Sequence, residues 1–183
     1  VSGQRLVVPV ADPERERPGY TPRPGLYTLD VTSGELLWQQ PVDRGCEIEE
    51  KNKPLIGLEN LRSSVKPELS ELYKCSFYYG LSAAATATPE LAFSAGLDGK
   101  LRAYDIATGE ILWQTQTAQA FVASNGIEGH GGAIDVSGQV VADGWVYVQS
   151  GYSMFGQLPG NVLLAYRVGD CRNPPLCDGS GGN

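Results

Sequence analysis

A glycine-rich stretch of mixed polar residues is the part of this sequence best suited to bind a ligand. It runs from Asn125 to Asp135 and holds Glu128 and His130 between glycines. Glycine lacks a Cβ, so backbone of this kind approaches a ligand or a neighbouring strand closely. An imidazole can move protons near neutral pH. Asn125, His130 and Asp135 are therefore candidate cofactor-binding residues. The alternative is a loop at the entrance of a structural unit, whose polar groups satisfy the backbone.

Outside this stretch, the sequence has no set of side chains typical of a catalytic site. The chain contains no nucleophile elbow, no phosphate-binding loop and no clustered set of metal ligands. We therefore assign no catalytic residue and no metal site. Any redox or group-transfer chemistry is expected to come from a bound cofactor.

The four cysteines are a second feature with chemical potential. They allow three pairings, of which Cys46–Cys75 and Cys171–Cys177 close the shortest loops. The first bond would tether a long insertion and the second a small loop in the tail. Free thiols are the alternative, and a zinc site is less favoured because no CxxC is present and the chain has one histidine. Disulfides favour a periplasmic or extracellular location.

Composition limits the function classes. The chain has 183 residues, 42% of them hydrophobic and 19% charged, with a net charge of −7. This composition is typical of a folded domain, and the acidic balance without a basic patch argues against a nucleic-acid partner. No apolar run is long enough to span a bilayer. Because the sequence begins at Val1, we expect a mature product or a piece of a longer chain.

An internal repeat is the strongest signal of the fold. The segment from Gly25 to Trp38 recurs from Lys100 to Trp113 with the same Asp, Gly, Glu, Leu and Trp positions, and a partial third copy runs from Gly160 to Arg167. Alternating residues followed by Asp-x-x-Ser/Thr-Gly-Glu predict a strand, a tight turn and a second strand.

The repeated positions have structural interpretations. Asp30 and Asp105 occupy the same place in the two turns, so we interpret them as turn residues rather than as a catalytic pair. Trp38 and Trp113 end the second strand of each hairpin and are expected to dock neighbouring sheets together, because an indole is a large apolar group with one donor.

Further short strands precede each hairpin. The second strands of the units are predicted at Leu6–Val10, Leu91–Gly96 and Trp145–Gly151, and first strands of the second and third units at Ser82–Thr88 and Ala133–Val136. Units of about four strands are typical of β-propeller blades. The sequence therefore predicts an all-β fold, a partial β-propeller of about three blades.

The expected boundaries follow from these units. The partial propeller spans residues 1–168, with blades at about 1–40, 80–117 and 130–168, an insertion at 41–79 and a flexible, cysteine-containing tail at 169–183. Within the insertion, Lys66–Lys74 is a candidate helix, and the insertion is either a surface loop or a lid. Since a propeller needs about 4 to 8 blades, missing N-terminal blades or another chain must complete the ring.

The repeat resembles the tryptophan-docking motif of pyrroloquinoline quinone (PQQ) dehydrogenases. The similarity extends to polyvinyl-alcohol-dehydrogenase-like proteins, and more specifically to their C-terminal part. It is carried by Leu81–Pro89, Phe93–Asp105, Asn125–Asp135 and the segment from Ser150 to Ala165. The resemblance implies a periplasmic propeller of about eight blades that holds PQQ and calcium, oxidises an alcohol and passes electrons to cytochrome c.

The functional prediction follows from this resemblance. We expect the C-terminal part of a PQQ-dependent alcohol dehydrogenase-like quinoprotein, inactive as an isolated piece. The loop Gly19–Gly25 carries no cysteine pair, although relatives of this subfamily often have one there. The alternative is a non-catalytic periplasmic propeller, a scaffold or binding protein that has lost the quinone, because fold alone does not fix function.

Overall fold

The protein is an all-β structure in the residues that can be described. The computed structural model describes residues 1–12, 18–42, 80–135, 137–152 and 157–167, and every helix or strand in these ranges is a β-strand. The predicted all-β class is therefore confirmed. All four cysteines, the candidate helix Lys66–Lys74 and nearly all of the insertion lie outside the described residues.

In the described ranges, no helix is long and apolar enough to cross a bilayer.

The first sheet contains three strands joined as an antiparallel meander. Its strands are β1 (Arg5–Val10), β2 (Gly25–Asp30) and β3 (Leu36–Pro41), in the order β1-β2-β3. Leu26 and Thr28 are fully buried on one face of β2, as the alternation of side chains along a strand requires. A β-bulge between Thr28 and Leu29 shifts the register, so that Thr28 lies opposite Trp38.

The second sheet has the full set of four strands. It runs β4 (Thr86–Ala87), β5 (Leu91–Ala95), β6 (Lys100–Asp105) and β7 (Ile111–Gln116) in sequential, antiparallel order. The bulge of the first sheet recurs between Ala103 and Tyr104, and it places Ala103 opposite Trp113. The predicted strand–turn–strand unit is therefore present twice, with the same irregularity in both copies.

The third sheet corrects one predicted strand. Its members are β10 (Val140–Ala142), β11 (Trp145–Ser150) and β12 (Val162–Arg167). The expected first strand at Ala133–Val136 was wrong, because Ala133 and Ile134 are buried outside any strand. Their backbone N–H groups donate to Leu158 O and Gly96 O across loops, at 2.8 and 3.1 Å. A buried loop segment can be as rich in apolar residues as a strand, so the composition of this segment did not distinguish the two.

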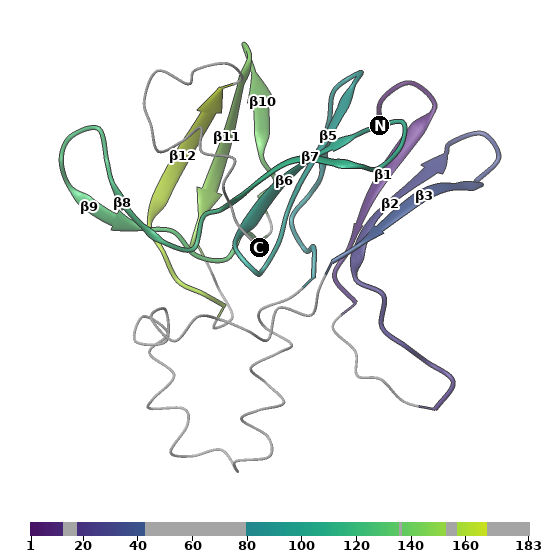
Figure 1. Ribbon diagram of the computed structural model, residues 1–183, viewed down its shortest axis with the longest axis horizontal. Coiled ribbons are helices and arrows are strands. Elements are labelled where there is room, and N and C mark those ends of the chain that lie inside the picture. The colour runs from purple at the N-terminus through teal and green to yellow at the C-terminus, as the bar shows by residue number, and fades with distance from the viewer. Residues whose placement is uncertain (13–17, 43–79, 136, 153–156, 168–183) are drawn as a thin grey trace.

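A small separate hairpin lies between the second and third sheets in the sequence. Strands β8 (Ala120–Val122) and β9 (Glu128–His130) pair antiparallel, with Ala120 opposite His130. The hairpin projects from the side of the molecule beside the third sheet (Figure 1). It carries part of the glycine-rich stretch that the sequence singles out.

The three meander sheets stand side by side in chain order (Figure 1). One apolar core lies between the first and second sheets and includes Leu26, Tyr104 and Ile106. Another lies between the second and third sheets and includes Phe93 and Val148. The second sheet therefore buries both of its faces, whereas each outer sheet uses one face for these cores.

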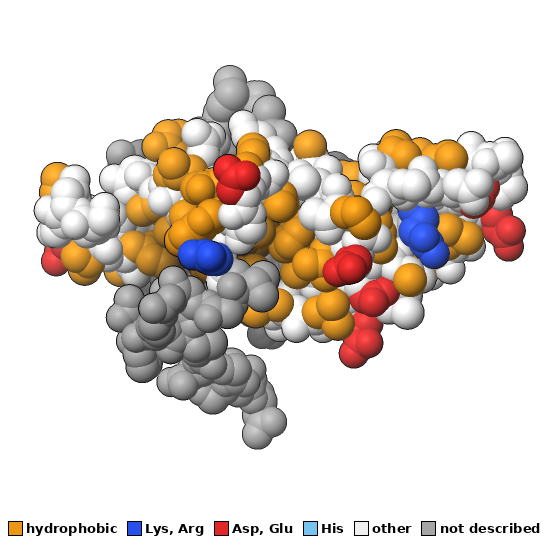
Figure 2. Space-filling model, turned by 90° about the horizontal axis from the view of Figure 1, so that it is seen from above, with side chains coloured by type: hydrophobic (Ala, Val, Ile, Leu, Met, Phe, Trp, Pro, Cys, Tyr) orange, Lys and Arg blue, Asp and Glu red, His pale blue; other side chains and the backbone are white. Residues whose placement is uncertain are grey.

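On the face shown in Figure 2, charged side chains are few and lie among many hydrophobic ones, and no extended basic patch is seen on this face. This surface agrees with the acidic net charge of −7.

Candidate functional site

The tip of the β8–β9 hairpin is built by Asn125 and Gly126. Asn125 Oδ1 accepts a hydrogen bond from Ile127 N at 3.1 Å, and Gly126 has a φ of +79°, a conformation that favours glycine. Ala123 N closes the turn by donating to Ile127 O at 2.9 Å. Asn125 is therefore an exposed turn residue, at the end of the hairpin farthest from His130.

His130 lies at the base of the hairpin and is partly buried. Its backbone N donates to Asn161 Oδ1 at 3.0 Å, and its carbonyl accepts from Asn161 N at 2.7 Å. The ring Nδ1 is buried without a hydrogen-bond partner. The strand is thus fixed to the loop before β12, while the imidazole keeps one nitrogen unused.

The glycines after His130 bring two backbone segments together. A Cβ on Gly131 would lie 1.8 Å from Thr117 O, and one on Gly160 would lie 2.4 Å from His130 O. Both distances are far below any real contact, so these positions accept only glycine. The close approach predicted for this stretch is therefore present, and the partner that the structure places there is neighbouring backbone.

Buried hydroxyl groups fix the same segment. Ser150 Oγ accepts from Gly132 N at 2.8 Å and lies 2.7 Å from Thr117 Oγ1, which donates to Gly99 O at 2.7 Å. Ser150 and Thr117 are both fully buried. The network connects the glycine-rich segment to the second and third sheets. It also supplies hydrogen-bond partners for the buried hydroxyl groups of Ser150 and Thr117.

Asp135 ends the candidate stretch in a different environment. Gln157 Nε2 donates to Asp135 Oδ2 at 2.9 Å. In the described ranges, no group of three or more His, Cys, Asp or Glu side chains gathers to hold a metal ion. Asn125 and His130 lie at opposite ends of the hairpin, so the structure does not bring these two candidate residues together.

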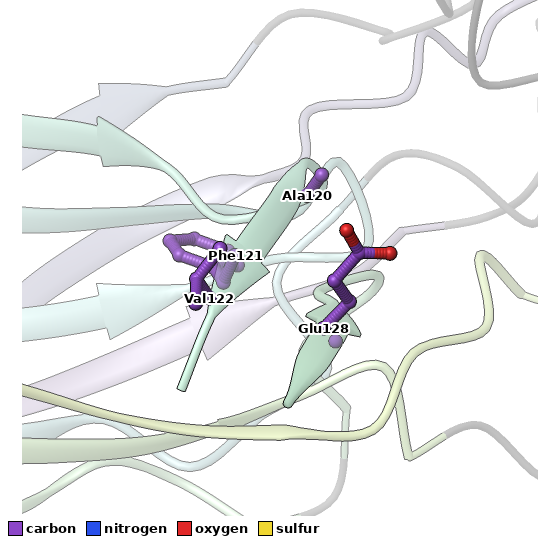
Figure 3. Close-up of a pocket in the computed structure, with 5 residues that line it drawn as sticks. Ala120, Phe121, Val122 and Glu128 are labelled. Atoms are coloured by element: carbon purple, nitrogen blue, oxygen red, sulfur yellow. The ribbon is translucent and has the colours of Figure 1, made fainter. Parts of the chain in front are cut away.

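A shallow pocket of about 250 Å³ lies on the same hairpin and is lined by Ala120, Phe121, Val122, Glu128 and Gly129. Figure 3 shows Phe121 and Val122 on one strand and Glu128 on the other, with the carboxylate directed away from Phe121. Glu128 and Val122 are exposed. A single exposed carboxylate beside apolar side chains provides no acid–base pair.

The two repeated aspartates form matching turns. Asp30 Oδ1 accepts from the backbone N of Thr32 and Ser33, both at 2.8 Å, and Asp105 Oδ1 accepts from Ala107 N and Thr108 N at the same distance.

These bonds favour the ionised form of both carboxyl groups. The pKa of Asp30 lies below its ordinary value because of the hydrogen bond from Ser33 N, followed by that from Thr32 N. The pKa of Asp105 is lowered in the same way, by Thr108 N and then Ala107 N. These carboxylates hold a turn and face no reacting group.

Trp38 joins the first sheet to the second. Its Nε1 donates to Ile106 O at 3.0 Å, and its ring stacks on Tyr104 with centroids 6.4 Å apart and an interplanar angle of 20°. Gly109 leaves room for the indole, because a Cβ there would lie 2.6 Å from Trp38 Cε3. We call Tyr104, the Ile106 carbonyl and Gly109 the indole seat of the second sheet.

Trp113 makes the corresponding contact with the third sheet. Its ring meets Tyr166 edge-on, with centroids 5.2 Å apart and an angle of 64°. Tyr166 follows Ala165 as Tyr104 follows Ala103 in the repeat. The residues that receive each indole were not named from the sequence, although the repeated glycine and the shared Ala-Tyr pair were signals for them.

Comparison with known proteins gives relatives for most of the chain, although no family model matches it. A polyvinylalcohol dehydrogenase of Sphingopyxis sp. (strain 113P3) is 29% identical over 157 residues, covering 80% of this chain and 20% of that protein. A polyvinylalcohol dehydrogenase of Pseudomonas sp. is 38% identical over 155 residues, covering 80% and 21%. The chain thus spans about one fifth of these curated relatives.

Comparison with solved structures gives BamB from Moraxella catarrhalis at a TM-score of 0.48 and 16% identity, covering 91% of this chain and 35% of that one. The computationally designed Ika4 protein gives a TM-score of 0.35 at 15% identity, covering 92% of this chain and 88% of that one. The predicted resemblance to polyvinyl-alcohol-dehydrogenase-like quinoproteins is confirmed, because 80% of this chain is similar to a part of two such dehydrogenases.

Proposed function

We propose that this chain is part of a PQQ-dependent alcohol dehydrogenase-like quinoprotein. The observation that carries the proposal is the similarity of 80% of the chain to two polyvinylalcohol dehydrogenases. The whole protein would oxidise an alcohol, with polyvinyl alcohol as the first substrate to test, and pass the electrons to a cytochrome c.

The architecture in this proposal is a partial propeller of about three blades. We place the blades at about 1–40, 80–117 and 130–168, with an insertion at 41–79 and a tail at 169–183. The two indole contacts support this arrangement, because Trp38 and Trp113 each bridge one sheet to the next. Blades outside this chain would close the ring.

The cofactors belong to the remaining blades in this proposal. PQQ and calcium need several polar ligands converging on one cavity, and the described residues gather no group of three or more His, Cys, Asp or Glu side chains that could hold a metal ion. A contact from His130 to the cofactor stays a prediction, and the partner-free Nδ1 supports it. Asn125 and Asp135 stay predicted contacts without such support. We therefore expect the isolated chain to be inactive.

The test compares the 183-residue chain with the full-length protein that contains it. Each is incubated with PQQ and calcium, and the reduction of an electron-accepting dye is followed with and without polyvinyl alcohol. We expect alcohol-dependent reduction by the full-length protein and none by the chain alone. If the full-length protein at saturating cofactor shows neither a quinone absorbance band nor alcohol-dependent reduction, the dehydrogenase proposal fails and a non-catalytic propeller replaces it.

We also propose a periplasmic or extracellular location with two disulfides, Cys46–Cys75 and Cys171–Cys177. The even number of cysteines and the long loop between the first two support it. Closing that loop would stabilise the protein by roughly 3 to 4 kcal/mol on the chain-entropy model. Mass spectrometry of alkylated protein from its native compartment should show no modified cysteine before reduction and four after it. Four alkylated thiols before reduction would contradict both bonds.

A further inference from the structure

The tip of the β8–β9 hairpin carries the only Asn-Gly dipeptide of the sequence, Asn125-Gly126. In such a dipeptide the backbone nitrogen of the glycine can attack the side-chain carbonyl carbon of the asparagine, because glycine has no Cβ that hinders the approach. Asn125 is exposed, and a Cβ on Gly126 would meet nothing within 4 Å. In the described part of the chain, no group therefore packs over this dipeptide.

The closed turn keeps the two reacting groups engaged elsewhere. Gly126 N donates to Ala123 O at 2.8 Å, and Asn125 Oδ1 accepts from Ile127 N at 3.1 Å. An intramolecular reaction is fast only when its two atoms meet in the correct geometry. The attack on Asn125 therefore requires that the tip of the hairpin opens.

The hairpin is built so that its tip opens at low cost. Its strands are joined by three residue pairs, and a two-stranded hairpin without further strands has little stability of its own. Val122 and Ile127, which flank the tip, are already 73% and 65% exposed. Opening exposes little additional apolar surface, so its free energy is small.

The base of the hairpin stays attached when the tip opens. His130 N donates to Asn161 Oδ1 at 3.0 Å, and Asn161 N donates to His130 O at 2.7 Å. Gly131 N also donates to Gln119 O at 2.9 Å. Opening is therefore a local event at the tip, and the three meander sheets keep their packing.

We propose that Asn125 is a modification site, which loses its side-chain amide when Gly126 N attacks it in the opened hairpin. A bond forms between Gly126 N and Asn125 Cγ, and the bond between Cγ and Nδ2 breaks. Gly126 N gives up its proton, and Nδ2 leaves as ammonia. The resulting cyclic succinimide is hydrolysed by water at either of its two carbonyl carbons, to aspartate or to isoaspartate.

The two products differ in their effect on the turn. Aspartate keeps an oxygen that can accept from Ile127 N as Asn125 Oδ1 does. Isoaspartate instead adds a methylene to the main chain between Ala123 and Ile127, whose backbone hydrogen bond of 2.9 Å closes the turn. The isoaspartate form should therefore lose the closed tip, whereas the aspartate form should retain it.

The test follows the 183-residue chain during incubation at mildly alkaline pH. Mass spectrometry of proteolytic peptides detects the replacement of the amide by a carboxyl group, and fragmentation distinguishes isoaspartate from aspartate. We expect both products at Asn125, formed faster as the pH rises because the attacking nitrogen must lose its proton. Asn161 is the internal control, since it is also exposed but is followed by Val162, whose branched side chain hinders the attack.

Two further samples separate the chemistry from the opening step. Asn125→Gln should show no conversion, because its longer side chain would have to close a larger ring. A peptide with the sequence of residues 120–130 has no anchored base, so it should convert faster than the chain. We expect the chain to be slower by up to about tenfold, which corresponds to an opening free energy of about 1.4 kcal/mol.

The proposal is overturned if Asn125 in the chain is converted no more than Asn161 while the peptide is converted completely. Equal rates in the chain and the peptide would overturn the opening step. Amide hydrogen exchange at Ile127 checks the consequence, since an isoaspartate form that protects this amide as the unmodified chain does would contradict the effect on the turn. No cofactor or alcohol is present, so these results are independent of the dehydrogenase assay.

Discussion

Tyr104 shows at the scale of one residue how the docking contact uses its side chains. The residue is fully buried, and its ring supports the Trp38 indole. Its hydroxyl is buried without a hydrogen-bond partner. Burial raises the pKa of Tyr104 to about 12 from an ordinary value of 10.0. The ring is therefore the useful part of this side chain, and the hydroxyl is a cost to stability.

Tyr104→Phe should therefore keep or increase the free energy of unfolding, by up to about 1 kcal/mol. The matched control is Tyr166→Phe, at the equivalent but only partly buried position of the third sheet, where loss of the hydroxyl should change the free energy of unfolding by less than about 0.5 kcal/mol. Urea denaturation at neutral pH measures both.

In alkali, Tyr104 ionises at a lower pH in the unfolded chain than in the folded chain. The stability of the wild type should therefore fall between pH 10 and about 12, and Tyr104→Phe should reduce that fall. A large loss of stability in Tyr104→Phe at neutral pH would contradict this account.

At the scale of elements, the repeated turn and the indole that covers it can be separated experimentally. Gly34 and Gly109 both have a left-handed backbone, which costs a non-glycine residue about 1 to 2 kcal/mol. Only Gly109 also lies against an indole. The two positions therefore form a natural pair for measuring the docking contact.

Gly109→Ala should destabilise the chain by about 2 kcal/mol more than Gly34→Ala, because the added methyl must displace the Trp38 ring. Thermal or urea unfolding of the two variants gives the comparison directly. Equal losses would mean that Trp38 does not rest on Gly109 in solution.

Most strands could be predicted from the sequence, because the repeat supplied two independent copies of one pattern. The expected strands Leu91–Gly96 and Trp145–Gly151 correspond to β5 and β11. The prediction of a strand at Ala133–Val136 was wrong because a buried loop and a buried strand both require apolar residues. The β8–β9 hairpin was missed although Asn125-Gly126 is a strong turn signal.

The candidate site was less predictable for a physical reason. Asn125, His130 and Asp135 are close in the sequence, but a hairpin sends its tip and its base to opposite ends. Two of the glycines between them, Gly131 and Gly132, serve close packing against the backbone of Thr117 and Leu158. Composition alone does not distinguish backbone that approaches a ligand from backbone that approaches another strand.

At the scale of the whole molecule, three sheets stand side by side (Figure 1). They share two apolar cores and are connected through the indoles of Trp38 and Trp113. Among the described residues, the central sheet contributes side chains to both cores and each outer sheet to one. Large apolar residues remain exposed both on an outer sheet, as at Leu163 (66%), and on the last strand of the central sheet, as at Leu112 (53%).

The docking of neighbouring sheets by tryptophan is the claim on which the proposed propeller architecture depends. The most direct measurement is the set of nuclear Overhauser effects from the Trp38 indole in the 183-residue chain. We predict strong effects from the Trp38 ring protons to Gly109 Hα and the Tyr104 ring, and from the Trp113 ring to Tyr166. A folded chain with dispersed amide signals and no effect between Trp38 and Gly109 or Tyr104 would contradict the account.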